Sequence, residues 1–329
     1  MNNCPFFSII MITYNHELYV EEAIKSFLMQ KITFPIEIII AEDCSTDRTK
    51  IICSKYFSKY PEKVRLITSN TNVGPQANFI RALNAAKGKY VAYCDGDDYW
   101  TDPYKLQKQV DFLESNDDYS TCFHYAKIFN QEKGEFEEQR LGPLEAKECY
   151  SIDDLLESLN CIPTCSVVFR NKLYPELPAW YYKLSIGDYP LHILNALKGK
   201  IGLINEDMSV YRRHKQGVFS GGSEKYNLLK VISTHKVIGK KLKLFNRKSY
   251  KRGLLHCYYR LSILSVNDGK RCAALKYCLL SVYESTFKQK KRVLLELIFH
   301  ISPNTYKFFM MVRKIKNEVK SLYNKITYL

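Results

Sequence analysis

The sequence lacks the two glycine-rich signatures by which many α/β proteins bind nucleotides. No G-x-G-x-x-G follows the first predicted strand, and no G-x-x-x-x-G-K-[ST] occurs in the 329 residues. Such loops bring backbone N–H groups against phosphate, so the dinucleotide-binding and P-loop classes lose support. The eleven cysteines form no C-x-x-C pair, and Cys161 and Cys165 have no second pair to complete a zinc site. Their odd number and scatter favour a reduced, cytosolic compartment.

Long apolar runs are also missing from the sequence. A membrane-crossing helix needs about 18 to 20 consecutive apolar residues, and the longest candidate, Val293 to Ile301, is short and contains Glu296 and His300. The chain opens without a basic segment ahead of an apolar one, so no signal peptide is expected. We therefore expect a cytoplasmic protein that is soluble or lies on the inner face of the cytoplasmic membrane without crossing it.

Acidic residues are scarce in the C-terminal third. From Lys225 to Leu329 there are 24 Lys and Arg residues and four Asp and Glu residues, whereas the rest of the chain has 25 and 30. This asymmetry favours a polyanionic partner, a membrane surface or nucleic acid, and a solvated basic helical face explains it equally well. The segment has amphipathic helical spacing but no aromatic-basic platform or reading helix. We expect residues 224–329 to form a basic helical region that contacts an anionic membrane surface, with no nucleic-acid partner.

The rest of the chain alternates short apolar runs with amphipathic helical patterns. The order β-α-β-α-β-α-β over the first hundred residues predicts a parallel sheet with right-handed crossovers. The predicted strands are 7–13, 36–41, 64–68, 89–94, 120–130 and 162–170, and a further strand is predicted just before Val210. The predicted helices are 17–30, 47–60, 75–86 and 188–197, one that begins at the Thr101-Asp102 cap, one that begins at Ser151, and others at 226–244, 250–266, 273–283, 293–301 and 306–315. Residues 131–146 are predicted to be a polar loop.

Polar side chains gather where three of these strands end. They are Thr13, Tyr14 and Asn15 after the first strand, Glu42 and Asp43 at the second, and D-G-D-D at residues 95–98 after the fourth. The carboxyl ends of parallel strands meet at one edge, where open α/β sheets bind ligands. Asp residues at alternate positions in an extended turn can hold a divalent cation. The alternative is a solvated turn, because Asp and Gly are turn residues.

Five stretches in register resemble family 2 glycosyltransferases. They are S-I-I-M-I-T-Y-N-H at 8–16, E-I-I-I-A-E-D-C-S-T-D-R-T at 37–49, N-x-G at 72–74, G-K-Y-V-A-Y-C-D-G-D-D-Y-W at 88–100 and T-D-P-Y-K-L-Q-K-Q-V-D-F-L-E at 101–114. The last is similar to the bacterial branch, and Glu42 stands where the family often has Asp. The resemblance implies the GT-A fold, an α/β Rossmann-like arrangement with a mostly parallel central sheet flanked by helices. It implies a catalytic domain over 1–223, in which 1–100 bind the nucleotide sugar and 101–223 the acceptor.

The resemblance also implies roles for the polar residues. Asp43 would accept a hydrogen bond from the N–H of the donor's pyrimidine ring, with Thr13 and Tyr14 beside the base, and Asn15 would also belong to the donor site. Asp95 would face the ribose or the metal, Asp97 would be the main ligand of Mn²⁺ or Mg²⁺, and Asp98 would orient the sugar or the metal shell. Arg212 or Arg213 would contact the phosphates, and His214 the metal or the diphosphate. The alternatives are that Thr13 is a plain strand end, that Tyr14 is a half-buried packing residue and that His214 is a surface or capping residue.

Asp188 lies where the family places its catalytic base. An inverting transfer needs one carboxylate to take the proton from the acceptor hydroxyl. The alternative is a helix N-cap, which the position of Asp188 also suits.

The predicted function is inverting, metal-dependent transfer of a sugar from a nucleotide-diphosphate donor, expected to be a UDP-sugar. The acceptor would be a hydroxyl of a glycan or lipid-linked glycan in bacterial surface polysaccharide synthesis, such as capsule or lipopolysaccharide. One alternative is a sugar-1-phosphate nucleotidyltransferase, which would carry a glycine-rich basic loop where T-Y-N-H-E-L-Y stands at 13–19. The other is a basic membrane- or nucleic-acid-binding protein without transferase activity.

Overall fold

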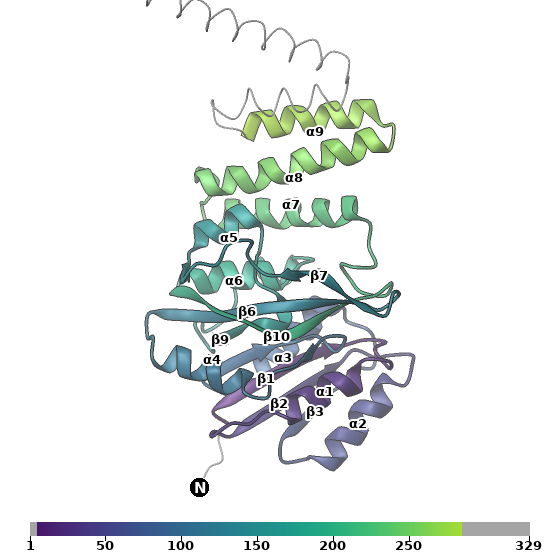
Figure 1. The fold of residues 1–329 in the computed structure, drawn as a ribbon, viewed down its shortest axis with the longest axis vertical. Helices are drawn as coiled ribbons and strands as arrows, with labels where there is room; N and C mark the ends of the chain where they lie inside the picture. Colours follow the sequence, from purple (N-terminus) through teal and green to yellow (C-terminus); the bar gives the residue numbers. More distant parts are fainter. Residues whose placement is uncertain (1–4, 285–329) are drawn as a thin grey trace, which may run out of the picture.

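The first strand, β1 (Phe7–Thr13), has a parallel strand on each side in a ten-stranded sheet. The computed structural model describes residues 5–284 (Figure 1). β1 pairs with β2 (Ile36–Glu42) and β4 (Tyr90–Tyr93), and β3 (Val64–Ile67) pairs with β2. The connecting helices are α1 (Val20–Leu28), α2 (Thr49–Lys59) and α3 (Pro75–Ala85). The predicted parallel β-α-β half is therefore confirmed.

The second half of the sheet mixes strand directions. The order of strands along the sheet is β3-β2-β1-β4-β9-β6-β10-β5. β9 (Val168–Arg170) is antiparallel to both β4 and β6 (Tyr119–Asn130), while β10 (Lys200–Arg213) is parallel to β6 and antiparallel to β5 (Tyr99–Trp100). The helices of this half are α4 (Lys105–Glu114), α5 (Ile152–Ser158) and α6 (Asp188–Ala196), and β8 (Cys149–Tyr150) pairs with β10.

Helices cover both faces of the sheet because successive side chains of its buried strands point to opposite sides. On β1, Phe7, Ile9 and Met11 belong to a core that contains buried side chains of α1, α2 and α4. Ile10 belongs to the other core, with side chains of α3, α5 and α6. Figure 1 shows α1 and α2 on one side of the sheet and α5 and α6 on the other.

Three local predictions were wrong. Residues 131–146 contain a strand, β7 (Glu135–Leu141), which is antiparallel to β6; its polar sequence suits an exposed outer strand and gives no buried-strand signal. The predicted strand 162–170 begins only at Val168, after a short 3₁₀ turn (η1, Thr164–Ser166), because Pro163 cannot donate to a sheet. The helix predicted to follow the Thr101-Asp102 cap begins only at Lys105, after a turn in which Asp102 Oδ1 accepts the Tyr104 N–H at 2.7 Å, the contact expected of a capping Asp.

Beyond β10, three helices are stacked on the sheet domain. They are α7 (Glu224–Lys241), α8 (Lys248–Asn267) and α9 (Arg271–Glu284), and in Figure 1 they lie successively farther from the sheet. Ile232, Ile238 and Leu254 belong to the same core as Ile10 of β1, so the hydrophobic core continues from the sheet into these helices. The predicted α-helical appendage is thus confirmed for residues 224–284, whereas the predicted helices 293–301 and 306–315 lie outside the described residues. Among residues 5–284, no helix is both long and apolar enough to span a membrane.

Candidate active site

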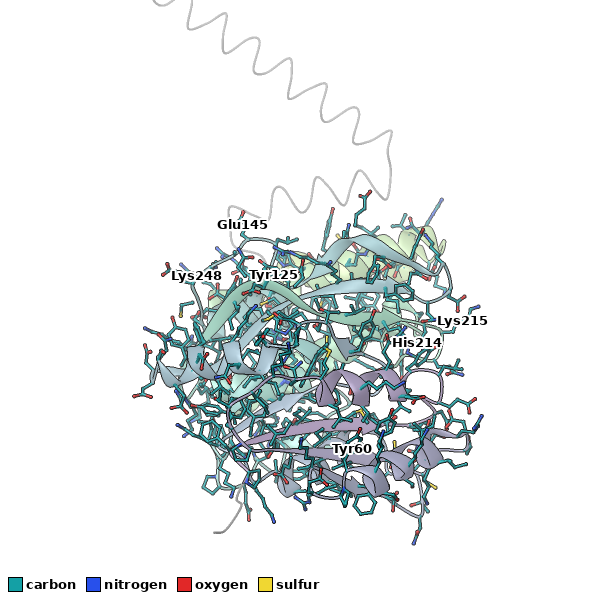
Figure 2. All side chains as sticks on the ribbon, turned by 60° about the horizontal axis from the view of Figure 1, so that its bottom comes forward. Tyr60, Tyr125, Glu145, His214, Lys215 and Lys248 are labelled. Atoms are coloured by element: carbon teal, nitrogen blue, oxygen red, sulfur yellow. The ribbon has the colours of Figure 1, made fainter. Side chains whose placement is uncertain are left out.

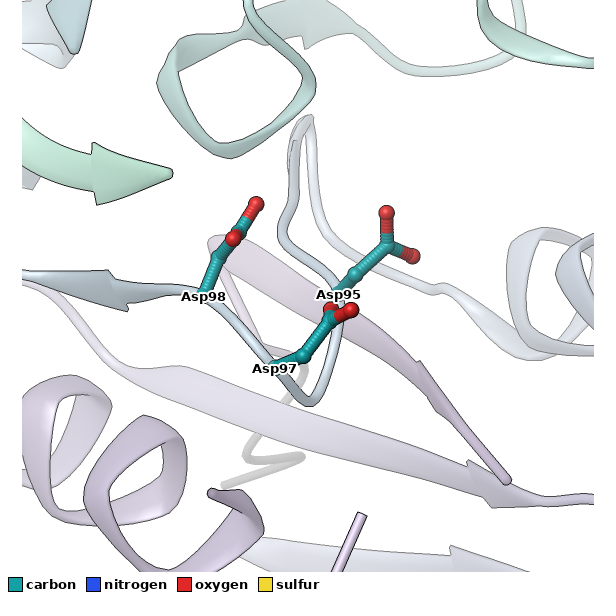
Figure 3. A group of neighbouring side chains, drawn as sticks. All are labelled: Asp95, Asp97 and Asp98. Atoms are coloured by element: carbon teal, nitrogen blue, oxygen red, sulfur yellow. The ribbon is translucent and has the colours of Figure 1, made fainter. Parts of the chain in front are cut away.

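The three carboxylates of the D-G-D-D sequence lie together on the loop that follows β4 (Figure 3). Oxygens of Asp95, Asp97 and Asp98 lie within 4.8 Å of one another. Gly96 is needed between them, because a Cβ there would stand 2.7 Å from the hydroxyl oxygen of Thr13. The Gly96 N–H donates to the Ile12 carbonyl at 2.9 Å. The ends of β1 and β4 therefore meet, as their parallel order predicts.

Burial and neighbouring charges shift the pKa values of these carboxyls in different directions. Burial raises the pKa of Asp95 to about 8, and the charge of Asp97 adds to this effect. Burial, together with the charges of Asp97 and Asp95, raises the pKa of Asp98 well above its usual value. Burial would raise the pKa of Asp97 too, but the neighbouring imidazoles of His16 and His214 outweigh it, and the pKa is lowered. Carboxylates this close cannot all ionise without a compensating positive charge.

Two imidazoles face the same oxygen of Asp97. Nε2 of His214 lies 2.9 Å from Asp97 Oδ2, and Nε2 of His16 lies 3.7 Å from it. The Nδ1 atoms of both rings are buried and have no hydrogen-bond partner within residues 5–284. His214 lies beside Lys215 where the chain leaves β10 (Figure 2). His16 is a site residue that the sequence prediction missed, although its place directly after Thr13-Tyr14-Asn15 could have marked it.

Arg212, at the end of β10, holds the Asp loop in place. Its side chain is 7% exposed, and its guanidinium donates to Glu22 Oε2 at 2.6 Å, Gln131 Oε1 at 2.8 Å and the Asp97 carbonyl at 3.0 Å. Its backbone N–H donates to Asp98 Oδ1 at 2.9 Å. The structure does not bring Arg212 to the cavity described below, so its position indicates a structural clamp and does not support the predicted phosphate contact.

Arg213 faces the other way. It lines the cavity, and its guanidinium lies 2.7 Å from Glu137 Oε2 of β7. Of the two arginines, Arg213 is therefore the one placed to meet a ligand.

Asp43, at the end of β2, fixes the loop that carries N-x-G. Its two carboxylate oxygens accept the N–H groups of Val73 and Gly74, each at 2.9 Å, and Arg81 lies 3.7 Å away. Each oxygen keeps a second lone pair, so Asp43 can still accept a hydrogen bond from a ligand. Asp43 lines the cavity.

The three polar residues after β1 have different surroundings. Thr13 and Tyr14 both line the cavity; the Thr13 hydroxyl is buried without a partner in the described part of the chain, and Tyr14 is 41% exposed. Asn15 does not line the cavity, and its Oδ1 accepts the Thr46 N–H at 2.8 Å. Asn15 therefore joins the loops that follow β1 and β2, and its position does not support the predicted contact with the donor.

Asp188 is the first residue of α6, so it is not the helix N-cap, which is Gly187. Its Oδ1 accepts the Tyr189 N–H at 2.7 Å. Its Oδ2 accepts from Asn160 Nδ2 at 3.1 Å and from the Thr164 hydroxyl at 3.2 Å. Three donors thus hold this carboxylate at the wall of the cavity.

One cavity of about 1290 Å³ brings these groups together. Asp43, Asp95, Asp97 and Asp188 all line it, as does the loop at residues 215–222. Leu228 and Val231 of α7 complete one wall, which the prediction of a separate C-terminal region did not anticipate. The volume is ample for a ligand larger than a typical drug molecule, for which pockets measure roughly 300–1,000 Å³.

The residues present fit a divalent cation. Carboxylate oxygens are the ligands that Mg²⁺ and Mn²⁺ prefer, and imidazole nitrogen suits many transition metals. Burial and the neighbouring carboxylates raise the pKa values of Asp95 and Asp98, and a bound cation would oppose both effects. The three oxygens of Asp95, Asp97 and Asp98 are close enough together to hold one, whereas Nε2 of His214, a predicted metal contact, lies against Asp97 Oδ2.

Comparison with known proteins identifies the family. The sequence model described as glycosyl transferase family 2 matches residues 8–174, just over half of the chain. An uncharacterized protein of Mycobacterium tuberculosis is 42% identical over 213 residues, which cover 64% of this chain and 60% of that protein. A putative teichuronic acid biosynthesis glycosyltransferase of Bacillus subtilis, TuaG, is 38% identical over 110 residues, or 33% of this chain and 42% of that protein. The matched region thus spans less than two thirds of these relatives.

Solved structures share the fold. TarS of S. aureus, residues 1–349 in complex with UDP-GlcNAc, aligns with a TM-score of 0.53 and 18% identity over 86% of this chain and 91% of that chain. The mannosyltransferase PcManGT of Pyrobaculum calidifontis, in complex with GDP-Man and Mn²⁺, aligns with a TM-score of 0.53 and 15% identity. The alignment covers 98% of this chain and 88% of that chain. At these identities the likeness establishes the fold.

Proposed function

The chain belongs to glycosyltransferase family 2, and from this we propose that it transfers a sugar, with inversion at the anomeric carbon, from a nucleotide-diphosphate donor to a hydroxyl of a glycan acceptor. The observation that carries the proposal is the single cavity that Asp43, Asp97 and Asp188 line together. Asp43 could accept a hydrogen bond from the base, Asp97 could bind a cation and Asp188 could accept a proton. The reaction requires these three groups around one bound donor and acceptor.

The donor would lie along the side of the cavity between Asp43 and the Asp loop. Asp43 would accept the N–H of a uracil ring, with Thr13 and Tyr14 beside it, and Arg213 would meet the diphosphate. A UDP-sugar is the donor we propose: a carboxylate acceptor matches the ring N–H of uracil, as it would match the ring N–H of thymine or guanine. The TarS and PcManGT structures were determined with UDP-GlcNAc and GDP-Man, which supports nucleotide-sugar binding by this fold without choosing the base.

We propose that Asp97 and Asp95 hold Mn²⁺ or Mg²⁺, with His214 beside them. The cation would neutralise the diphosphate as it leaves. Asp97 suits this role because its pKa is lowered. Burial alone would raise the pKa, but His16 and His214 favour the ionised carboxylate and outweigh that effect. Asp98, whose Oδ1 accepts the Arg212 N–H at 2.9 Å, would keep the loop shaped around the cation and sugar.

Asp188 would take the proton of the acceptor hydroxyl. Both lone pairs of Oδ2 are used by Asn160 and Thr164, whereas Oδ1 has one donor, the Tyr189 N–H. Oδ1 keeps a free lone pair, so the proton would pass to Oδ1 while the acceptor oxygen bonds to the anomeric carbon and the bond from that carbon to the diphosphate oxygen breaks.

The acceptor would lie between Asp188 and α7. Leu228 and Val231 of α7 line the cavity there, while Tyr226 and Leu229 on the same helix are 56% and 41% exposed. A lipid-linked glycan at an anionic membrane surface would therefore meet the basic helical region next to the site, with each basic residue near the surface contributing about 1 kcal/mol. The teichuronic acid assignment of TuaG agrees with a role in surface polysaccharide synthesis.

The test is an Asp188→Asn variant, assayed for transfer and for donor binding. We expect transfer to fall by roughly 100- to 10,000-fold, as for loss of a general base, with the Kd for the donor unchanged. Asp117→Asn is the matched control, because Asp117 has a 97% exposed side chain and does not line the cavity. Full transfer by Asp188→Asn, or loss of donor binding together with transfer, would contradict the proposed base.

A further inference from the structure

Two consecutive non-glycine residues next to the cavity have left-handed backbone conformations. Leu159 has φ 59° and Asn160 has φ 85°. Asn tolerates this region because its side chain can bond locally, but Leu does not favour it. Such conformations cost on the order of 1–3 kcal/mol each and persist where the surroundings enforce them, often at functional sites. The strained pair directly follows α5 and places the Asn160 side chain against Asp188.

The amide of Asn160 is held in one orientation. Its Oδ1 lies 3.2 Å from the Ile162 N–H and 2.9 Å from His192 Nδ1. A backbone N–H can only donate, so the oxygen must face it, and the NH₂ group is left to donate to Asp188 Oδ2 at 3.1 Å. Rotating the amide by half a turn would set its oxygen against the Asp188 carboxylate and its NH₂ against the Ile162 N–H.

His192 anchors this amide. It is fully buried on α6, one turn after Asp188. Because Asn160 Oδ1 accepts, Nδ1 of His192 must carry hydrogen, and burial lowers the pKa of His192 to about 4, so the ring is neutral. The remaining nitrogen, Nε2, is buried and has no partner within the described chain. The contacts of His192 thus point to one task, which is to hold Asn160.

We propose that Asn160 is a positioning residue for the reaction, fixed by His192, and that it aims the Asp188 carboxylate by binding Oδ2 and so leaving Oδ1 for the acceptor proton. The inference rests on the proposed function, in which Asp188 is the base. The positive φ angles of Leu159 and Asn160 are then explained, because this backbone conformation places the Asn160 amide against the Asp188 carboxylate. The Thr164 hydroxyl supplies the second donor to Oδ2, at 3.2 Å.

The first test is Asn160→Gly. Glycine accepts φ 85° without strain, so the variant should keep its fold while losing the side chain. We expect kcat for transfer to fall by about 10- to 100-fold, as a misplaced catalytic group costs, with the KM for the donor unchanged. Lys172→Gly is the matched control, because Lys172 also has a positive φ, of 54°, but is exposed and away from the cavity. Unchanged kcat in Asn160→Gly would overturn the proposal.

The second test separates positioning from packing at His192. His192→Leu removes the N–H, whereas His192→Asn can restore one near the position of Nδ1. We expect the Leu variant to lose activity like Asn160→Gly, the Asn variant to recover most of it, and the double variant Asn160→Gly/His192→Leu to be no worse than either single one. Additive losses, or equal activity in the Leu and Asn variants, would refute the link.

The reference for both tests is Asp188→Asn. Where that variant loses transfer and Asn160→Gly does not, only the positioning role fails. Where Asp188→Asn itself transfers at the full rate, the proposed base fails first.

Discussion

Replacing Asp95 with Asn should stabilise the metal-free protein, and increasingly so as the pH rises. The folded protein raises the pKa of Asp95 from 3.8 to about 8, chiefly through burial and then through the charge of Asp97. Between pH 4 and pH 8 the carboxyl is ionised in the unfolded chain but still protonated in the folded protein. Rising pH therefore favours the unfolded chain, and stability is lost across this range. At about 1.4 kcal/mol per pH unit, the cost at pH 7 is about 4 kcal/mol at most, because the carboxyl keeps some contact with solvent.

Asparagine has nearly the shape of the protonated carboxyl and can keep the 2.7 Å contact with the Tyr93 hydroxyl. In thermal unfolding with a chelator present, Asp95→Asn and wild type should therefore be nearly equal at pH 4. By pH 8 the variant should unfold several degrees higher, given about 2–4 °C per kcal/mol. Asp117→Asn, an exposed control, should show no such trend. A difference that does not change with pH, or a variant less stable at pH 8, would refute the reasoning.

Three further predictions concern buried groups elsewhere in the sheet domain. Lys105 is fully buried, and burial lowers its pKa from 10.5 to about 8. Its buried charge therefore destabilises the folded protein below pH 8, and this destabilisation disappears as the pH rises from 8 to 10.5. Lys105→Met should therefore stabilise the protein at pH 7 by about 2 kcal/mol in denaturant unfolding, with the gain shrinking above pH 8. Gly88→Ala should destabilise by more than about 3 kcal/mol, because a Cβ there would lie 2.6 Å from backbone atoms of Phe7 and Ser8; Gly222→Ala, with its nearest contact at 3.1 Å, is the control. Arg212→Met should lower the free energy of unfolding by about 3 kcal/mol and weaken metal binding in calorimetry, whereas intact metal affinity would show that the Asp loop does not need the clamp.

The N-terminal half of the fold was predictable because its signals are local. The apolar run of β1 was placed residue for residue at Phe7–Thr13, and β2 and α3 differ from prediction by one residue at an end. Parallel order alone predicted that polar residues at the ends of β1, β2 and β4 would gather, and Thr13, Asp43 and Asp95 do line one cavity. Buried strands and helix stripes specify these features without help from distant contacts.

The second half was harder to predict because its elements depend on distant partners. β7 has the polar sequence E-F-E-E-Q-R-L and is a strand only because β6 offers it an edge. Arg212 and Arg213 are adjacent, and nothing in the sequence tells which one turns inward to Glu22 and which lines the cavity. Asn160 carried no signal at all, since its role depends on α6 lying beside the end of α5.

The most direct measurement of the central claim is thermal unfolding with UDP-, GDP- and dTDP-sugars, each with and without Mn²⁺. A ligand that binds the native state raises its stability by mass action. We expect a UDP-sugar to raise the unfolding temperature in the presence of Mn²⁺, and the rise to be lost in Asp97→Ala but kept in Asp188→Asn. An equal rise without metal, or a rise that survives Asp97→Ala, would contradict the proposed site.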